Sequence, residues 1–328
     1  MRTRRSILFL VLTVLLVSAL PGAAEGSSRP ARKKGALGIT EFPVPTPSSR
    51  PYQIVTGPDG NLWFTESDAG KIGKITPSGE ITEYKLAKGS VPYGITVGPD
   101  GNIWFTERLG NAIAKMNTAG QLLAEYFLPT LNAQPWGITT GPDGNLWFTE
   151  ENADVIGMVT VGGLFSEFPT NNCCFPTFIT TGKDGRLWFT EELQGQIGAM
   201  STDGSVEYFT PPTAQLLYGI TTGPDGNVWF TGLTGINKLG KIEPNGQITE
   251  VLGPAVFTGI AGVTTGPDGN FWFTLNDIGR VAGITPSGGR LGSFPAGSYP
   301  IGITAGPDGN VWFTESQSNA IGRVNLGS

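Results

Sequence analysis

Carboxylates close a recurrent Trp-Phe-Thr segment at five of its seven places in this 328-residue chain. The five residues are Glu66, Glu107, Glu150, Glu191 and Glu315, and the other two copies end in Gly232 and Leu275. Carboxylates gathered at one mouth could hold a cation such as Mg²⁺ or Ca²⁺, or raise one another's pKa by repulsion. The alternatives are solvated strand ends, or side chains that accept hydrogen bonds from the backbone of adjacent loops.

A second set of residues opens the apolar run before each Trp-Phe-Thr segment, after the proline where one is present. In chain order these residues are Tyr52, Tyr93, Trp136, Thr177, Tyr218, Ala261 and Ile301. Four aromatic side chains face smaller or aliphatic ones, which is typical of a binding floor for a small molecule, peptide or glycan. The alternative is that these side chains only plug a channel.

The remaining reactive side chains limit which catalytic and metal sites the chain could form. Cys173 and Cys174 are the only cysteines. In an exported protein they could form a disulfide, although adjacent Cα atoms lie only ~3.8 Å apart, and free thiols are the alternative. The chain has no histidine, which excludes a Ser-His-Asp triad and histidine-based zinc sites. No GxxxxGK phosphate loop is present.

These candidates belong to a repeat that fixes the architecture. Segments related to Gly-Pro-Asp-Gly-Asn begin at positions 57, 98, 141, 182, 223, 266 and 306, so successive copies are 40 to 43 residues apart. Such a period indicates four short strands per repeat and a β-propeller. We therefore predict an all-β fold, a seven-bladed β-propeller of four-stranded antiparallel blades.

The first repeat shows how a blade is expected to form. Apolar and β-branched residues predict strands over 52–56, 61–66, 71–76 and 81–86. Asp-Gly and Ser-Gly turns join strands at one end, while longer and more variable loops lie at the other. We expect the Trp-Phe pairs to fill the core between blades, and the long-loop face to carry the function.

The ends of the chain complete the organisation. The last repeat lacks a fourth strand, and residues 39–42 match residues 81–84 of the first repeat. We therefore expect the N-terminal strand to close the ring. The domains predicted are a signal peptide over 1–24, a flexible linker over 25–36 and the propeller over 37–328.

Charge and targeting restrict the partners. Basic residues before an apolar run over 7–20 predict a secreted, periplasmic or cell-surface protein without a membrane span after cleavage, an uncleaved anchor being the alternative. Seven of the 21 basic and one of the 27 acidic residues lie in the first 34 positions, so the remainder carries a net charge of −12. Such a surface repels phosphate backbones, so we expect no nucleic-acid partner. We also expect the protein to be a monomer.

The repeat unit over Pro92–Glu107, with the Ile-Gly-Lys-Ile-Thr-Pro-Ser-Gly run that begins at Ile72, is similar to that of the virginiamycin B (streptogramin B) lyase family. The resemblance covers residues 37–328. It implies Mg²⁺-assisted elimination that linearises cyclic depsipeptides over the channel mouth. Tyr52 and Glu315 match a tyrosine and a glutamate of the family site.

At three positions the chain departs from that family site. Ala261 and Ile301 stand where the family has histidines, and Tyr299 stands where it has another glutamate. Neither an alanine nor an isoleucine can act as a general base. The resemblance therefore implies the family fold without the family mechanism.

Three functions follow from these features. The first is a non-catalytic propeller that binds a small molecule, peptide or glycan at the mouth. The second is a lyase, or a lactonase-like enzyme that uses carboxylates and a metal. The third is a structural or protein-interaction propeller whose aromatic residues are a plug.

Overall fold

The computed structural model describes residues 37–170, 175–213, 216–232, 239–251 and 259–327. The predicted signal peptide and linker, and the cysteine pair Cys173 and Cys174, lie outside these residues. Residues 37–328 form one compact unit. The described part is built from strands, with one short 3₁₀ helix, η1 (Asn276–Ile278), and it contains no helix long and apolar enough to cross a membrane.

The strands form seven antiparallel four-stranded sheets, which confirms the predicted all-β, seven-bladed propeller. The first four blades are β2 (Pro51–Thr56), β3 (Leu62–Glu66), β4 (Lys71–Ile75), β5 (Ile81–Lys85); β6 (Pro92–Val97), β7 (Ile103–Glu107), β8 (Ala112–Met116), β9 (Leu122–Phe127); β10 (Pro135–Thr140), β11 (Leu146–Glu150), β12 (Val155–Val159), β13 (Phe165–Pro169); and β14 (Pro176–Thr181), β15 (Leu187–Glu191), β16 (Gln196–Met200), β17 (Val206–Phe209). The last three are β18 (Leu217–Thr222), β19 (Val228–Gly232), β20 (Leu239–Ile242), β21 (Ile248–Val251); β22 (Ile260–Thr265), β23 (Phe271–Leu275), β24 (Arg280–Ile284), β25 (Arg290–Pro295); and β26 (Pro300–Ala305), β27 (Val311–Glu315), β28 (Ala320–Asn325), β1 (Gly38–Pro43).

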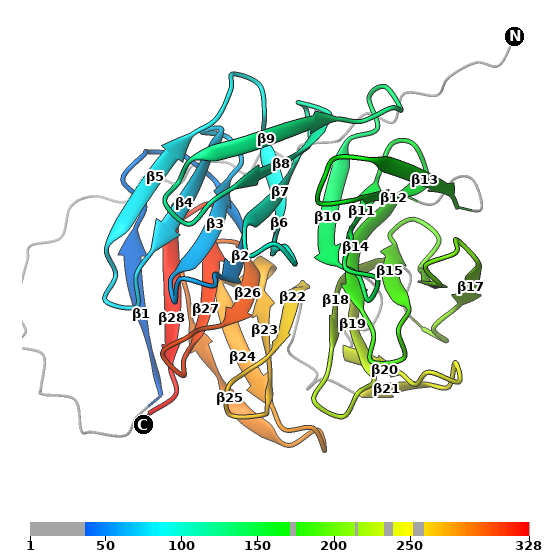
Figure 1. Ribbon diagram of the computed structural model, residues 1–328. Helices are drawn as coiled ribbons and strands as arrows, with labels where there is room; N and C mark the ends of the chain where they lie inside the picture. The colour runs from blue at the N-terminus through cyan, green and yellow to red at the C-terminus, as the bar shows by residue number, and fades with distance from the viewer. Residues whose placement is uncertain (1–36, 171–174, 214–215, 233–238, 252–258, 328) are drawn as a thin grey trace, which may run out of the picture. The chain divides into compact units, whose positions relative to one another are not determined.

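The blades are arranged in a closed ring around their first strands (Figure 1). Each innermost strand contacts the innermost strand of the next blade, from β2 through β6, β10, β14, β18 and β22 to β26. Strand β26 then contacts β2. The second residue of every inner strand is therefore brought to the same end of one central channel.

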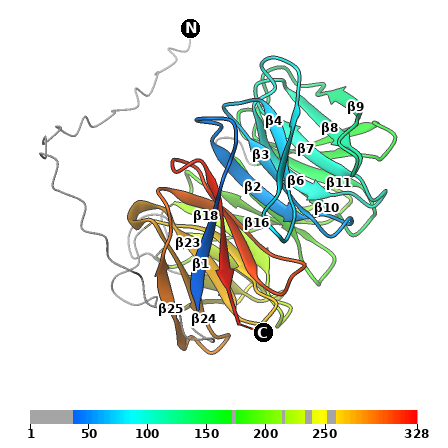
Figure 2. The same ribbon diagram turned by 90° about the vertical axis from the view of Figure 1, so that its left-hand side faces the viewer.

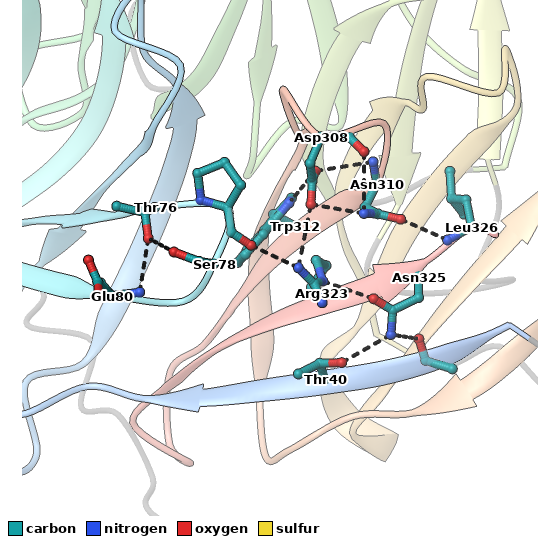
Figure 3. A network of polar contacts seen from close by, with 12 residues as sticks. Thr40, Thr76, Ser78, Glu80, Asp308, Asn310, Trp312, Arg323, Asn325 and Leu326 are labelled. Atoms are coloured by element: carbon teal, nitrogen blue, oxygen red, sulfur yellow. Dashed lines mark hydrogen bonds and ion pairs between the residues drawn. The ribbon is translucent and has the colours of Figure 1, made fainter. Parts of the chain in front are cut away.

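Strand β1 completes the last blade, as the sequence predicted. It pairs antiparallel with β28, with Ile39 opposite Val324, so the blue and red ends of the described chain lie side by side in Figures 1 and 2. The Asn325 side chain donates hydrogen bonds to the Gly38 carbonyl (3.1 Å) and to Thr40 Oγ1 (3.0 Å). Arg323 donates to the Pro77 carbonyl of the first blade (2.9 Å), as Figure 3 shows.

The predicted aromatic core is confirmed. Trp63 and Phe64, and their counterparts in the other blades, are at most 2 % exposed. Each tryptophan also donates its indole N–H to the aspartate of its own Asp-Gly turn, as Trp63 Nε1 does to Asp59 Oδ1 (3.1 Å). Gly57 must be glycine because a Cβ atom there would lie 2.5 Å from the Trp63 ring. The repeated motif therefore fixes the position of one buried tryptophan in each blade.

Candidate functional site

The predicted aromatic residues meet at the channel mouth and pack on one another. Tyr52, Tyr93 and Ile301 form a buried cluster, with the partly buried Trp136 and Tyr218 against it. Ring centroids lie 4.4 Å apart for Tyr52 and Tyr93, and 4.7 Å apart for Tyr93 and Trp136. The other two members of the predicted ring, Thr177 and Ala261, are fully buried. These side chains close much of the channel, and only parts of Trp136 and Tyr218 are left accessible.

A hydrogen bond between two tyrosines spans this plug. The Tyr52 and Tyr218 hydroxyl oxygens are 2.6 Å apart, although the residues belong to the first and fifth blades. Burial raises the pKa of both hydroxyls well above the ordinary value of 10. Both tyrosines are therefore neutral at physiological pH, and the pair is a polar cross-link within an aromatic cluster.

Arg108 covers part of the aromatic cluster. Its guanidinium lies 5.3 Å from the centroid of Tyr93 and 4.8 Å from that of Trp136. Glu151 of the next blade accepts its Nη2 hydrogen bond at 2.6 Å. Both residues belong to the variable long loops. Cation–π contacts of this kind are worth about 0.5–2 kcal/mol, so Arg108 holds the accessible face of the plug.

The five predicted glutamates end the second strand of their blades, but they are buried beneath the long loops. All are at most 1 % exposed. Burial, followed by the negative charge of Glu83 on β5, raises the pKa of Glu66 to about 8. Burial and the facing carboxylates Glu125 and Glu167 raise the pKa of Glu107 and Glu150 to about 8. Each of these three side chains is thus a neutral carboxyl within its own blade.

Glu315 accepts a hydrogen bond from a loop amide. Its Oε1 accepts a hydrogen bond from the Gly297 amide (3.0 Å). Burial raises its pKa to about 7, although the Gly297 hydrogen bond opposes the rise. This arrangement matches the alternative in which the glutamate caps the backbone of the adjacent loop.

An open pocket lies on the long-loop side of the first and last blades. Its volume is about 480 Å³, within the range of small-molecule sites, and its walls are Ser48, Arg50, Asp68, Tyr299, Ser316 and Gln317. None of these residues was among the candidates predicted from the sequence, which noted Tyr299 only as standing where the family site has a glutamate. A further cavity of about 270 Å³ lies along the inner strands and is lined by threonines and by Trp136 and Phe178.

The pocket walls use backbone conformations that large side chains rarely adopt. Arg50 has φ 56° and Tyr299 has φ 60°, and both residues directly precede an inner strand. The carbonyls of these two residues accept hydrogen bonds from the amides of Ser67 and Ser316, at 3.1 and 3.0 Å. Residues at the same place in other blades share the conformation, namely Val91, Gln134, Phe175 and Gly259. No sequence signal identifies this ring, because most of its members are neither glycine nor asparagine.

The Mg²⁺ ion implied by the family does not fit this arrangement. The resemblance places Ala261, Ile301 and Tyr299 where the family has histidines and one glutamate, and Glu315 is buried against Gly297. Among the described residues, no three His, Cys, Asp or Glu side chains lie close enough to hold a metal ion. Mg²⁺ requires an octahedral set of oxygen ligands, which these residues do not supply.

The fold and the site define a seven-bladed β-propeller with its candidate site at one channel mouth. The model of the virginiamycin B lyase family matches residues 28–173 and 169–328, and the chain belongs to this family. Virginiamycin B lyases of Saccharopolyspora erythraea and Bordetella pertussis are 48 % and 42 % identical over 48 residues, which is 15 % of this chain and 16 % of each relative. These matches confirm the family resemblance that the sequence motifs indicated.

Solved structures match over most of the ring. A streptogramin B lyase is 35 % identical with a TM-score of 0.83, covering 88 % of this chain and 97 % of the other. A catalytically inactive histidine-to-alanine variant of virginiamycin B lyase from Staphylococcus aureus, solved with quinupristin, is 34 % identical with a TM-score of 0.83. That match covers 89 % of this chain and all of the other.

Proposed function

We propose that this chain is an exported member of the virginiamycin B lyase family that binds a small molecule, peptide or glycan without converting it. The observation that carries the proposal is the state of the two positions where the resemblance implies histidine. Ala261 is 0 % exposed, and Ile301 is 1 % exposed and packs with Tyr52 and Tyr93. Neither side chain can accept a proton, and neither faces an open site.

The tyrosine that matches the family site supports the same proposal. The Tyr52 hydroxyl is hydrogen-bonded to Tyr218, and burial keeps its pKa well above 10. Such a hydroxyl is not available as a base at physiological pH. Tyr52 therefore has a structural role in the plug.

Loss of catalysis is compatible with retention of a ligand in this family. The Staphylococcus aureus variant described above is catalytically inactive and was solved with quinupristin. In this chain the pocket of about 480 Å³ on the long-loop face offers a place for a ligand beside the plugged channel.

One observation favours catalysis as a second candidate. The pKa of Glu315 is raised to about 7, chiefly by burial, which suits a general base near neutral pH. Its neighbour Ser316 lines the open pocket. Replacement of Glu315 by glutamine would abolish an activity of this kind and would leave ligand binding in place.

The test is to incubate the purified chain with quinupristin in the presence and absence of Mg²⁺. Isothermal titration calorimetry measures binding, and mass spectrometry of the drug measures linearisation. We expect unchanged drug after prolonged incubation. Linear product at many turnovers would overturn the non-catalytic proposal, and its loss in the Glu315→Gln variant would establish the second candidate.

Export is tested separately. A chain expressed with its full N-terminus and recovered outside the cytoplasm should begin near Glu25 when its intact mass is measured. An unprocessed chain held in the membrane fraction would instead support the uncleaved anchor.

A further inference from the structure

We infer that the open pocket over the first and last blades recognises a neutral, hydroxyl-rich ligand, namely a saccharide. The inference deepens the proposed binding function by naming the ligand class for one part of the mouth. It rests on the chemistry of the six lining residues Ser48, Arg50, Asp68, Tyr299, Ser316 and Gln317.

The pocket offers donors and acceptors in balance. Arg50 supplies only donors and Asp68 only acceptors, while serine hydroxyls and the glutamine amide supply both. The backbone amides of Ser316 and Gln317 donate to the Tyr299 and Ser298 carbonyls, and among the described residues the side chains of Ser48, Ser316 and Gln317 have no hydrogen-bond partner, Ser316 being 6 % exposed. A sugar hydroxyl also donates and accepts, so a saccharide can satisfy all of these groups together.

The charged pair in the pocket is weak and can open to a ligand. Arg50 Nη1 lies 3.6 Å from Asp68 Oδ1, and the two side chains are 45 % and 55 % exposed. Exposed ion pairs of this kind contribute little to stability. Their charges cancel, so an anion or a cation would bind one partner and leave the other without its counter-charge.

Tyr299 supplies an apolar surface beside these polar groups. It is 37 % exposed, more than any residue of the aromatic plug. Its backbone is held at φ 60° by the hydrogen bond from the Ser316 amide to its carbonyl (3.0 Å). An aromatic face with polar neighbours suits the C–H face and the hydroxyls of a sugar ring.

Other ligand classes fit less well. An apolar peptide side chain would desolvate several polar groups with one tyrosine to compensate. A zwitterionic amino acid could pair with Arg50 and Asp68, but it would leave most of the remaining hydrogen-bonding groups without a partner. A saccharide is the ligand class that can both form hydrogen bonds with the polar lining residues and pack against Tyr299.

The test is calorimetric titration of the purified chain with two panels. One panel holds neutral oligosaccharides (cellotetraose, chitotetraose, maltotetraose and xylotetraose), and the other holds quinupristin, free amino acids and short uncharged peptides. The variants are Tyr299→Gly and Asp68→Asn. The glycine relieves the positive φ, so the Tyr299 variant should fold at least as well as the parent chain.

Gln134→Gly is the matched control, because Gln134 has φ 53° at the same place in another blade and lies outside the pocket. We expect an oligosaccharide to bind, with affinity reduced at least tenfold in both pocket variants and unchanged in the control. Saccharide binding that survives Tyr299→Gly would overturn the assignment to this pocket. Binding confined to the second panel would overturn the saccharide class and leave the proposed function standing. Binding in neither panel would contradict both.

Discussion

The Thr314 hydroxyl donates a hydrogen bond of 2.8 Å to the backbone carbonyl of Tyr52, a residue 262 positions earlier in the chain. The same bond joins every blade to the next, from the Trp-Phe-Thr threonine to the second residue of the following inner strand, as for Thr149 and Thr177 (2.6 Å). The joint that closes the ring is therefore equivalent to the other six. The threonine of the repeat connects blades, and its strict position reflects that role.

Replacing one of these threonines should weaken the ring. Thr149 Oγ1 also accepts the Gly137 amide (2.9 Å), so Thr149→Val leaves two buried backbone groups without partners. Each such group costs about 1–3 kcal/mol. We expect a corresponding loss in the free energy of unfolding, measured with urea. Thr221→Val is the control, because Thr221 lines the inner cavity. Equal losses in the two variants would show that the inter-blade bond contributes nothing.

Removal of the N-terminal strand should expose the last blade. Deletion of residues 37–46 removes β1 and the Phe42 ring, which stacks on Trp312 with centroids 5.3 Å apart. The free edge of β28 would then promote aggregation or a clear fall in melting temperature. Deletion of residues 25–34 should change the melting temperature little. Equal melting temperatures for the two truncations would contradict closure by β1.

The fold could be predicted from the sequence because its determinants are local and repeated. Turn residues recur at fixed offsets from each Trp-Phe-Thr segment, and residues 39–42 carry the pattern of a missing fourth strand. Strand β2 was expected over 52–56 and spans Pro51–Thr56. Periodicity and turn chemistry were sufficient for this level of detail.

The site could be predicted only in part, because burial there depends on other elements. The sequence placed Glu66 at the end of its strand, but its burial depends on the long loop above it, and its raised pKa depends on that burial and on Glu83 two strands away. Likewise, the left-handed conformation of Arg50 is imposed by a bond from the Ser67 amide to its carbonyl. Neither residue type signals these environments.

A tryptophan packed between blades and a tryptophan at the channel mouth should respond differently to truncation. Trp147 is 0 % exposed in the wedge between blades, so Trp147→Ala should cost about 3–5 kcal/mol of stability. Trp136 is partly exposed at the mouth, and its indole N–H has no partner among the described residues. We expect Trp136→Ala to cost less than half as much in chemical denaturation. Comparable losses would show that the aromatic plug is as important to the fold as the wedges, which would favour the structural alternative.

Stability should fall as the pH rises from about 4.5 to about 8. Unfolded glutamate ionises near pH 4.5, whereas the pKa of Glu66, Glu107 and Glu150 is about 8 in the folded ring, mainly because of burial. The unfolded chain therefore binds fewer protons over this interval, and unfolding becomes easier as the pH increases. Each pH unit in this interval lowers the free energy of unfolding by at most about 1.4 kcal/mol per glutamate.

Asp59 has the opposite effect at lower pH. Burial alone would raise its pKa, but hydrogen bonds from Asn61 and Trp63 hold the pKa below 3.8, so the stability it contributes is lost as the pH falls through that value. The melting temperature should therefore be greatest in mildly acidic solution, between these two limits.

A single amide substitution tests the buried carboxyls. Gln is neutral at every pH, so Glu150→Gln should remove one glutamate's share of the pH dependence and stabilise the ring at pH 8 relative to the parent chain. Glu80→Gln is the matched control, because Glu80 is exposed. Thermal unfolding of the three chains between pH 4 and pH 9 measures the effect. If the Glu150→Gln and Glu80→Gln chains follow the same curve, Glu150 has the same pKa in the folded and unfolded chains, which would contradict the raised pKa of the buried carboxyl.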